Sequence, residues 1–260
     1  MNKSIVKGLS ASVVVAALFS AGSAHALCGA VTRAAFETAA NTAAVETVNY
    51  GFGLPMWATM VNENGRVCHV YSTDGAANTG IFAGNKAWLG SRVISAQKAN
   101  TATAFSLDGL SISTGGIYVA VQPGGSLYGL QHSNPVDAAA AYSQTDGNGV
   151  VRGASGYGTA NDPLNGKIVG GVNVFGGGLA LYNAVGVKVG GLGASGDSSC
   201  RDHVFAWRMR VALALDAAPN SEALKFTTLA PAALFESPEC GVSSGSTTLL
   251  TTTNLTYGIQ

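Results

Sequence analysis

Residues 191–196 read GLGASG, and they stand after an apolar, strand-like run at residues 187–190 and before an expected helix at residues 200–217. Residues 197–199, DSS, supply side-chain oxygens that typically accept hydrogen bonds from the first turn of a helix. The G-x-G-x-x-G spacing is also the fingerprint of dinucleotide-binding sheets. Such a sheet needs several further strand–helix units, and the 260-residue chain ends too soon after Gly196 to provide them. The stretch therefore predicts a tight turn from a strand into a helix, where glycine permits close packing.

Outward from this turn, hydrophobic patterns predict further strands and two more helices. Helices are expected over residues 31–48, which are Ala-rich without Gly or Pro, and over residues 86–105, where apolar residues recur on one side. Asn64 and Gly65 form a hairpin turn signal. The strands are expected over residues 56–62, 67–71, 117–121, 172–175 and 178–182. This order favours an α+β fold, with an antiparallel β-sheet and flanking helices.

The first 26 residues have the organisation of a secretory signal peptide. Lys3 and Lys7 precede an apolar stretch centred on residues 13–18, and residues 24–26 form a small-x-small cleavage site. The apolar stretch is too short for a comfortable membrane span. We expect cleavage near Ala26 and a periplasmic or secreted protein.

The remaining chain is expected to form one domain and a tail. The domain covers residues 27–220 and includes a long excursion at residues 131–166, which is polar and rich in Gly, Asn and Asp. Loops of this length are often functional or mobile. The tail, residues 221–260, contains a Ser/Thr-rich stretch.

Composition excludes several classes of protein. Lys+Arg and Asp+Glu both number 14, so there is no basic excess for nucleic-acid binding. Hydrophobic residues make up 47% of the chain, which is too many for a disordered protein. No segment after the signal peptide is long and apolar enough to predict a transmembrane helix.

Four cysteines remain after cleavage: Cys28, Cys68, Cys200 and Cys240. An even number in an oxidising compartment favours disulfides and allows three pairings, although buried free thiols are the alternative. We expect at least one disulfide, and Cys200 with Cys240 as the pair that ties the tail to the domain.

His132 and His203 are the candidate metal ligands, because histidine is a common ligand of haem iron and other metals. Trp207 lies one helical turn after His203 and could form an apolar wall beside it. A hydrogen-bonded structural role is the alternative for each, and for His69 it is the favoured one. The spacing of the three histidines does not form a zinc motif. A Ser195–Asp202–His203 triad is disfavoured, since neighbouring residues on a helix point about 100° apart.

Four stretches together resemble the haem-binding GlcG/HbpS family, which includes the C-terminal domain of PduO-type adenosyltransferases. They are residues 91–102 (SRVISAQKANTA), 122–125 (QPGG), 175–179 (FGGGL) and 189–197 (VGGLGASGD). Residues 133–136 (SNPV) and 196–203 (GDSSCRDH) resemble a secreted subgroup. The resemblance implies an antiparallel sheet with helices packed on it in profilin-like layers, homo-oligomers, and binding of haem or a related tetrapyrrole. Fold transfers better than function.

The resemblance also implies a set of ligand-binding residues. Some relatives ligate haem through a histidine in the N-terminal helix, but residues 31–48 contain none. If haem is bound, His132 or His203 is expected to replace that ligand, unless a non-histidine group does so. The further candidates are Thr101 in the family's helix motif and, as donors to the haem propionates, Arg92, Lys98, Ser198 and Ser199.

These observations leave three functions open. The favoured one is an exported haem- or tetrapyrrole-binding protein, acting in haem sensing, storage or transfer. The second is a small-molecule binding or sensor module without haem. The third is a redox or haem-degrading enzyme, for which no catalytic residue is assigned.

Overall fold

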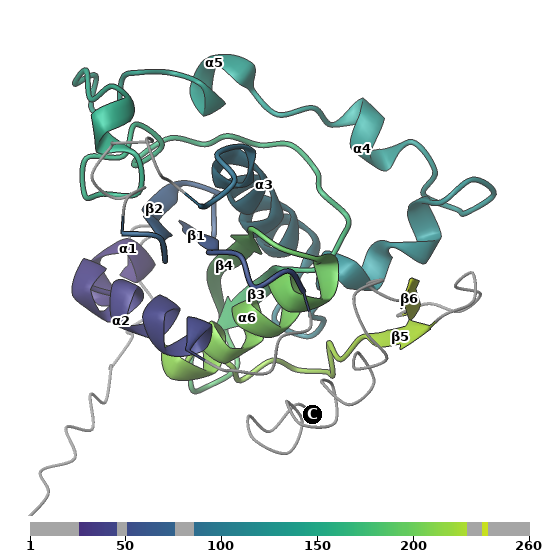
Figure 1. Cartoon of the computed structure of the whole chain (residues 1–260). Helices are drawn as coiled ribbons and strands as arrows, with labels where there is room; N and C mark the ends of the chain where they lie inside the picture. The colour runs from purple at the N-terminus through teal and green to yellow at the C-terminus, as the bar shows by residue number, and fades with distance from the viewer. Residues whose placement is uncertain (1–25, 46–50, 76–85, 228–235, 239–260) are drawn as a thin grey trace, which may run out of the picture.

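The computed structural model describes residues 26–45, 51–75, 86–227 and 236–238. Its centre is a four-stranded antiparallel sheet in the order β2-β1-β4-β3 (Figure 1). The strands are β1 (Trp57–Asn62), β2 (Val67–Ser72), β3 (Gly178–Tyr182) and β4 (Lys188–Ser195). The predicted α+β class is confirmed, and so is the hairpin, whose turn includes Gly65 with a φ of 76°.

Helices cover both faces of the sheet (Figure 1). On one face lies α3 (Gly90–Phe105), whose Val93, Ala96 and Ala99 share a core with Trp57. On the other face lie α2 (Arg33–Ala44) and α6 (Ser199–Ala212), in a core with Met60 and Leu192. The result is three layers, with the sheet in the middle.

The glycine stretch that was expected to be a turn is mostly strand. Residues 191–195 belong to β4, and the chain leaves the sheet only at Gly196. An added Cβ at Gly193 would lie less than 3.0 Å from the Ser95 carbonyl oxygen, and one at Gly191 equally close to that of Ala99. Glycine therefore allows α3 to lie directly on β4, so the close packing is confirmed but its location is corrected.

Two expected strands are absent from the described residues. Residues 117–121 instead form parts of two short helices, η2 (Gly115–Ile117) and η3 (Val119–Val121). Ile117 and Val121 are four residues apart and both bury against Val174, which is a helical spacing. Residues 172–175 are irregular, because their backbone bonds to α3: the Asn173 amide donates to Thr101 Oγ1 at 3.0 Å.

The excursion at residues 131–166 contains only short helices: α4 (Leu130–Ser133), α5 (Ala138–Ala141) and η4 (Ala154–Gly156). It nevertheless contributes Ala141 and Leu164 to the core beside α3. Beyond α6, the described part of the tail forms β5 (Lys225–Thr227) and β6 (Glu236–Pro238), which pair in parallel. Residues 1–25 of the expected signal peptide lie outside the described residues.

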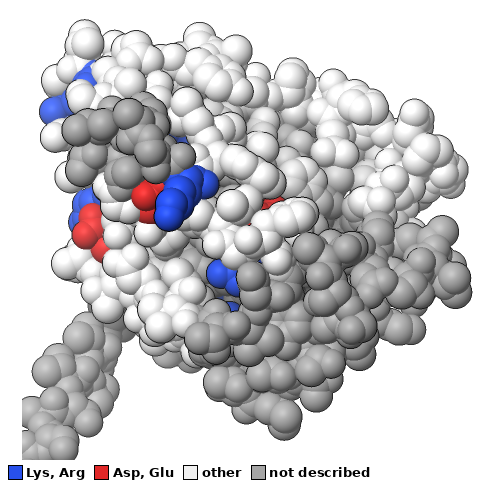
Figure 2. All heavy atoms as spheres, viewed as in Figure 1, with Lys and Arg blue, Asp and Glu red and all other residues white. Residues whose placement is uncertain are grey.

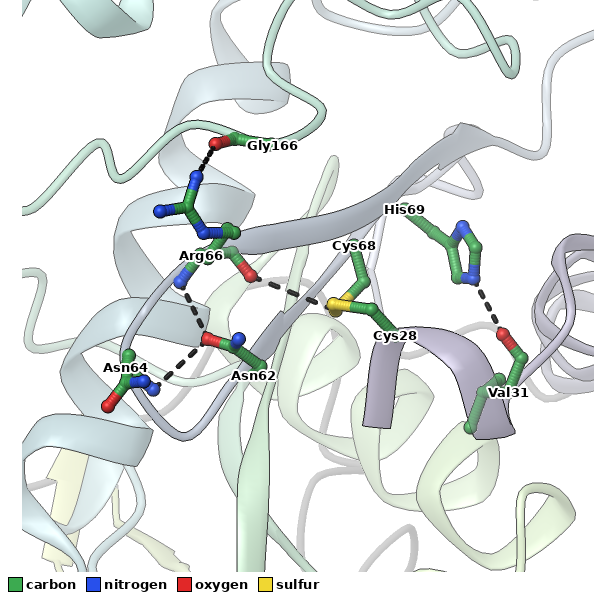
Figure 3. The surroundings of a disulfide bond; sticks show 8 residues. All are labelled: Cys28, Val31, Asn62, Asn64, Arg66, Cys68, His69 and Gly166. Carbon is green, nitrogen blue, oxygen red and sulfur yellow. Dashed lines mark hydrogen bonds between the residues drawn. A yellow bond between two sulfur atoms is a disulfide. The ribbon is translucent and has the colours of Figure 1, made fainter. Parts of the chain in front are cut away.

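A disulfide joins Cys28 to Cys68 and ties the short helix α1 (Ala26–Ala30) to β2 (Figure 3). The expectation of at least one disulfide is therefore confirmed. Cys200 is also disulfide-bonded, while Cys240, its expected partner, lies outside the described residues. Within the ranges described here, none of the helices has the length and apolar character needed to cross a membrane.

Candidate functional site

His203 lies on the second turn of α6 and is 1% exposed. No side chain of the described residues hydrogen-bonds its ring nitrogens, whose neighbouring hydrogen-bonding group is the Glu222 backbone, and its ring lies 6.0 Å from that of Trp207. Burial, aided by the positive charge of Arg210, lowers the pKa of His203 to about 3, while the nearby Glu222 backbone acts in the opposite direction. His203 is therefore a buried, neutral imidazole with no side-chain partner for either nitrogen atom.

A glycine segment, residues 176–178, covers the first turn of α6. An added Cβ at Gly176 would lie 3.0 Å from the His203 Cβ atom. The Gly176 amide donates a hydrogen bond to Ser199 Oγ at 2.8 Å. The predicted site residue Ser199 thus lies beside His203 and holds the backbone that encloses it.

Lys98 reaches this region from α3 and forms a buried ion pair with Asp202, the residue before His203. Its Nζ lies 2.7 Å from Asp202 Oδ2, donates to the Ala194 carbonyl at 2.9 Å and lies 4.4 Å from the centre of the Phe175 ring. Burial lowers the pKa of Lys98 and raises that of Asp202 to about 6, although each charge stabilises the other. The Lys98–Asp202 pair joins two elements far apart in the chain, and no sequence spacing indicates it.

The start of α6 already carries negative groups. Ser198 is the N-cap, and its Oγ accepts from the Arg201 amide at 3.3 Å. The Asp197 carboxylate accepts from the Ser198 amide at 2.6 Å, and Asp202 accepts from the Asp197 amide at 3.0 Å. The backbone amides in these contacts are therefore not available to donate to a bound anion. The negative charges of the Asp197 and Asp202 carboxylates would also repel an anion at this helix end.

Arg92 and Thr101 make contacts within the fold. The Arg92 guanidinium forms a bidentate ion pair with Asp162, with Nε at 2.9 Å from Oδ2, and stacks 3.8 Å from the centre of the Tyr157 ring. Thr101 donates to the Gln97 carbonyl at 2.8 Å and accepts from Asn173. Arg92 therefore anchors the excursion to α3, and Thr101 anchors residues 172–175.

The other histidines lie elsewhere. His132 is exposed on α4, which is well separated from α6 in Figure 1, and its ring meets that of Tyr128 edge-on. His69 Nε2 lies 2.8 Å from the Val31 carbonyl oxygen near the disulfide (Figure 3), so its expected structural role is confirmed. Nowhere in the described ranges do three His, Cys, Asp or Glu side chains gather as a metal site. The structure thus brings together His203, Lys98, Ser198 and Ser199, and leaves His132 apart.

The visible face of the molecule carries few charges. Figure 2 shows Lys and Arg side chains in small groups, partly beside acidic ones, on a largely uncharged surface. The candidate site itself consists of buried groups: His203, Lys98 and Asp202 are each at most 1% exposed.

The chain is an α+β domain with one buried, neutral histidine enclosed between a helix and a glycine segment. No known family model matches it, and no curated protein does. Among solved structures, it is similar to the crystal structure of a PduOC:heme complex, with 22% identity and a TM-score of 0.45 over 71% of this chain and 94% of that chain. It is also similar to Klebsiella pneumoniae protein ORFY, described as DUF336, with 23% identity and a TM-score of 0.42 over 70% and 89% of the two chains.

Proposed function

We propose that this chain is an exported protein that binds haem or a related tetrapyrrole, with His203 as the residue that would hold the iron. The observation that supports the proposal is the buried, neutral imidazole whose two nitrogens have no side-chain hydrogen-bond partner. Leaving a buried polar group unpaired costs about 1–3 kcal/mol, so such groups in native proteins call for an explanation. A ligand that coordinates to the imidazole provides one.

The protonation state and surroundings of His203 fit haem. Iron binds the neutral form of imidazole, which is the form that burial favours here. Trp207 and Phe175 supply aromatic surfaces near the imidazole and Lys98. When bound, haem would supply an iron centre that the histidine nitrogen could hold. The role of the protein would be to hold the ring and keep water away from it.

Export belongs to the same proposal and rests on the signal-peptide organisation of the first 26 residues. Homo-oligomer formation and a role in haem sensing, storage or transfer also belong to it and rest on the sequence resemblance. His132 is the second ligand candidate, because its exposed ring is accessible to a ligand at the surface.

The test is a visible absorption titration of the mature protein with haemin. We expect a saturable one-to-one shift of the Soret band, with affinity reduced at least about tenfold in His203→Ala, since even outer-shell partners of metal ligands act on this scale. His132→Ala and His69→Ala are the matched histidine controls, and thermal unfolding checks that each variant is folded. Loss of haemin affinity in His132→Ala alone would identify His132, on α4, as the iron ligand. Unchanged affinity in both candidate variants would remove histidine ligation.

A second candidate function is the binding of a small molecule without haem. It is favoured by the state of the two cationic residues among the four predicted propionate donors: Arg92 and Lys98 are already paired with buried carboxylates. A colourless ligand that hydrogen-bonds His203 would need neither donor. It would raise the midpoint of thermal unfolding in the wild type and not in His203→Ala, in a preparation that gives no saturable response to haemin.

A further inference from the structure

The chain beyond α6 returns across the molecule and is fixed at several points. Glu222 is buried and forms an ion pair with Arg210, whose Nη1 also donates to the Ala180 carbonyl at 3.0 Å. Asn220 accepts a hydrogen bond from the Ser111 amide at 2.6 Å and donates to the Ser111 carbonyl at 2.9 Å. We refer to residues 220–224 as the strap.

The strap lies against the surroundings of His203. The Glu222 backbone is close enough to the imidazole to affect its pKa. Leu224 is 1% exposed, and its side chain occupies the space where an added Cβ of Gly115 would lie. The same Cβ would lie 3.4 Å from Gly176 Cα, and Gly176 is in contact with His203. The glycine segment and the strap thus enclose the imidazole together.

The strap is separable from the rest of the fold. All four strands of the main sheet end by Ser195, and α6 ends at Ala212, so the strap adds no strand to that sheet. Its attachment combines one ion pair, the two Asn220 hydrogen bonds, the Glu222 backbone contact to His203 and one buried leucine, while Ser221 is exposed. Because none of these contacts belongs to the hydrogen-bond ladder of the main sheet, the strap can open locally without global unfolding.

We propose that the strap is a closing element of the His203 site, and that a ligand reaches the imidazole only when residues 220–224 are displaced. The identity of the ligand rests on the proposed function, whereas the closure rests on the contacts above. A closed strap reduces the apparent affinity of the site by the fraction of molecules that are open. Weakening the strap therefore exposes His203 and tightens ligand binding.

The direct test measures the accessibility of His203 in the full mature chain without any ligand. Diethyl pyrocarbonate acylates neutral imidazole, and peptide mass spectrometry gives a separate rate for each histidine. In Asn220→Ala we expect His203 to react at least about fivefold faster than in the wild type, because two hydrogen bonds that hold the strap are lost. His132, exposed on α4, is the internal reference and should react at one rate in both proteins.

Glu222→Gln is the second variant and weakens the ion pair with Arg210. An unfolded variant would be recognised by faster acylation of His69, which is distant from the strap in the fold. If Glu222→Gln is unfolded by this criterion, the His203 acylation rate in Asn220→Ala alone tests the strap proposal. A His203 rate that does not change in a folded Asn220→Ala, or that already equals the His132 rate in the wild type, would overturn the proposal.

Haemin titration of the same proteins separates the two proposals. If both hold, Asn220→Ala binds haemin more tightly, by about the factor seen in acylation. If His203 is more reactive in Asn220→Ala but neither the wild type nor the variant binds haemin, the result supports the strap proposal and contradicts the proposed function. If the wild type and Asn220→Ala bind haemin equally and acylate equally, the strap fails and the proposed function stands.

Discussion

At the scale of the residue, His203 and Asp202 are neighbours whose pKa values are moved by burial in favour of their neutral forms. The pKa of His203 falls from 6.5 to about 3, so the folded chain binds fewer protons there than the unfolded chain. The pKa of Asp202 rises from 3.8 to about 6, so the folded chain binds more. The two groups consequently have opposite effects on stability in acid.

This gives a prediction about pH. The contribution of His203 to the free energy of unfolding is fully present above pH 6.5 and is lost as the pH falls toward 3. The contribution of Asp202 to the same free energy grows as the pH falls from 6 to 3.8. Comparison of the wild type with His203→Leu isolates the first effect. We expect the wild type to lose stability relative to the variant by up to about 1.4 kcal/mol per pH unit below 6.5.

Urea unfolding at several pH values between 7 and 4 measures this difference. His132→Leu, in which an exposed histidine is replaced, should retain the pH dependence of the wild type. A constant difference between the wild type and His203→Leu at every pH would show that His203 is protonated as easily in the folded chain as in the unfolded one.

At the scale of the element, the contact between α3 and β4 determines how closely the sheet is covered. Gly193 and Gly191 face α3, while the alternate residues Leu192 and Ala194 face the other core. Because the backbone of α3 fills the space of a side chain at Gly193, any substitution must push the helix away from the sheet.

We predict that Gly193→Ala lowers the free energy of unfolding by more than about 2 kcal/mol, since overpacking against backbone has no side chain that could move aside. Gly90→Ala is the matched control, because no atom lies within 4 Å of an added Cβ there. It should be neutral, or stabilise by at most about 1 kcal/mol. Chemical unfolding measures both variants, and equal stability of the two would contradict the close contact.

The elements that could be predicted from the sequence are those specified by local signals. The hairpin turn at Gly65 and the capping by Ser198 depend on residues adjacent in the chain, and both are present. The strand expected at residues 117–121 is wrong, because Ile117 and Val121 have a helical spacing and these residues lie in two short helices.

Within the site, His203 was identifiable from its residue type and from Trp207 one turn later. The pairs Lys98–Asp202 and Arg92–Asp162 were not, because each joins residues that only the complete fold brings together. The charges of Lys98 and Arg92 indicate donors to an anion, but the fold gives them carboxylate partners of its own.

At the scale of the whole molecule, the disulfide between Cys28 and Cys68 connects the N-terminal part of the described chain to an edge strand of the sheet. Leu27, beside Cys28, is buried in the core under Gly190. The bond therefore fastens α1 where its apolar residue already packs.

We predict that Cys28→Ala and Cys68→Ala each lower the free energy of unfolding by about 2–4 kcal/mol, because the unfolded chain loses the same loop constraint in either case. The double variant should be about as stable as each single variant, which urea unfolding can measure. Alanine variants are preferable to a reductant, since Cys200 is also disulfide-bonded. Clearly additive losses would show that the two cysteines act independently.

The order of the strands has a consequence for the time that the chain needs to form its sheet. Strand β1 pairs on one side with β2, which follows it directly, but on the other side with β4, where Trp57 meets Ser195. At a synthesis rate of about 5–20 residues per second, β4 appears on the order of ten seconds after β1. During that interval one edge of the β1–β2 hairpin has unpaired amide and carbonyl groups, which are a template for pairing with another chain. The unpaired edge of β1 is thus open to such pairing until β4 has been made.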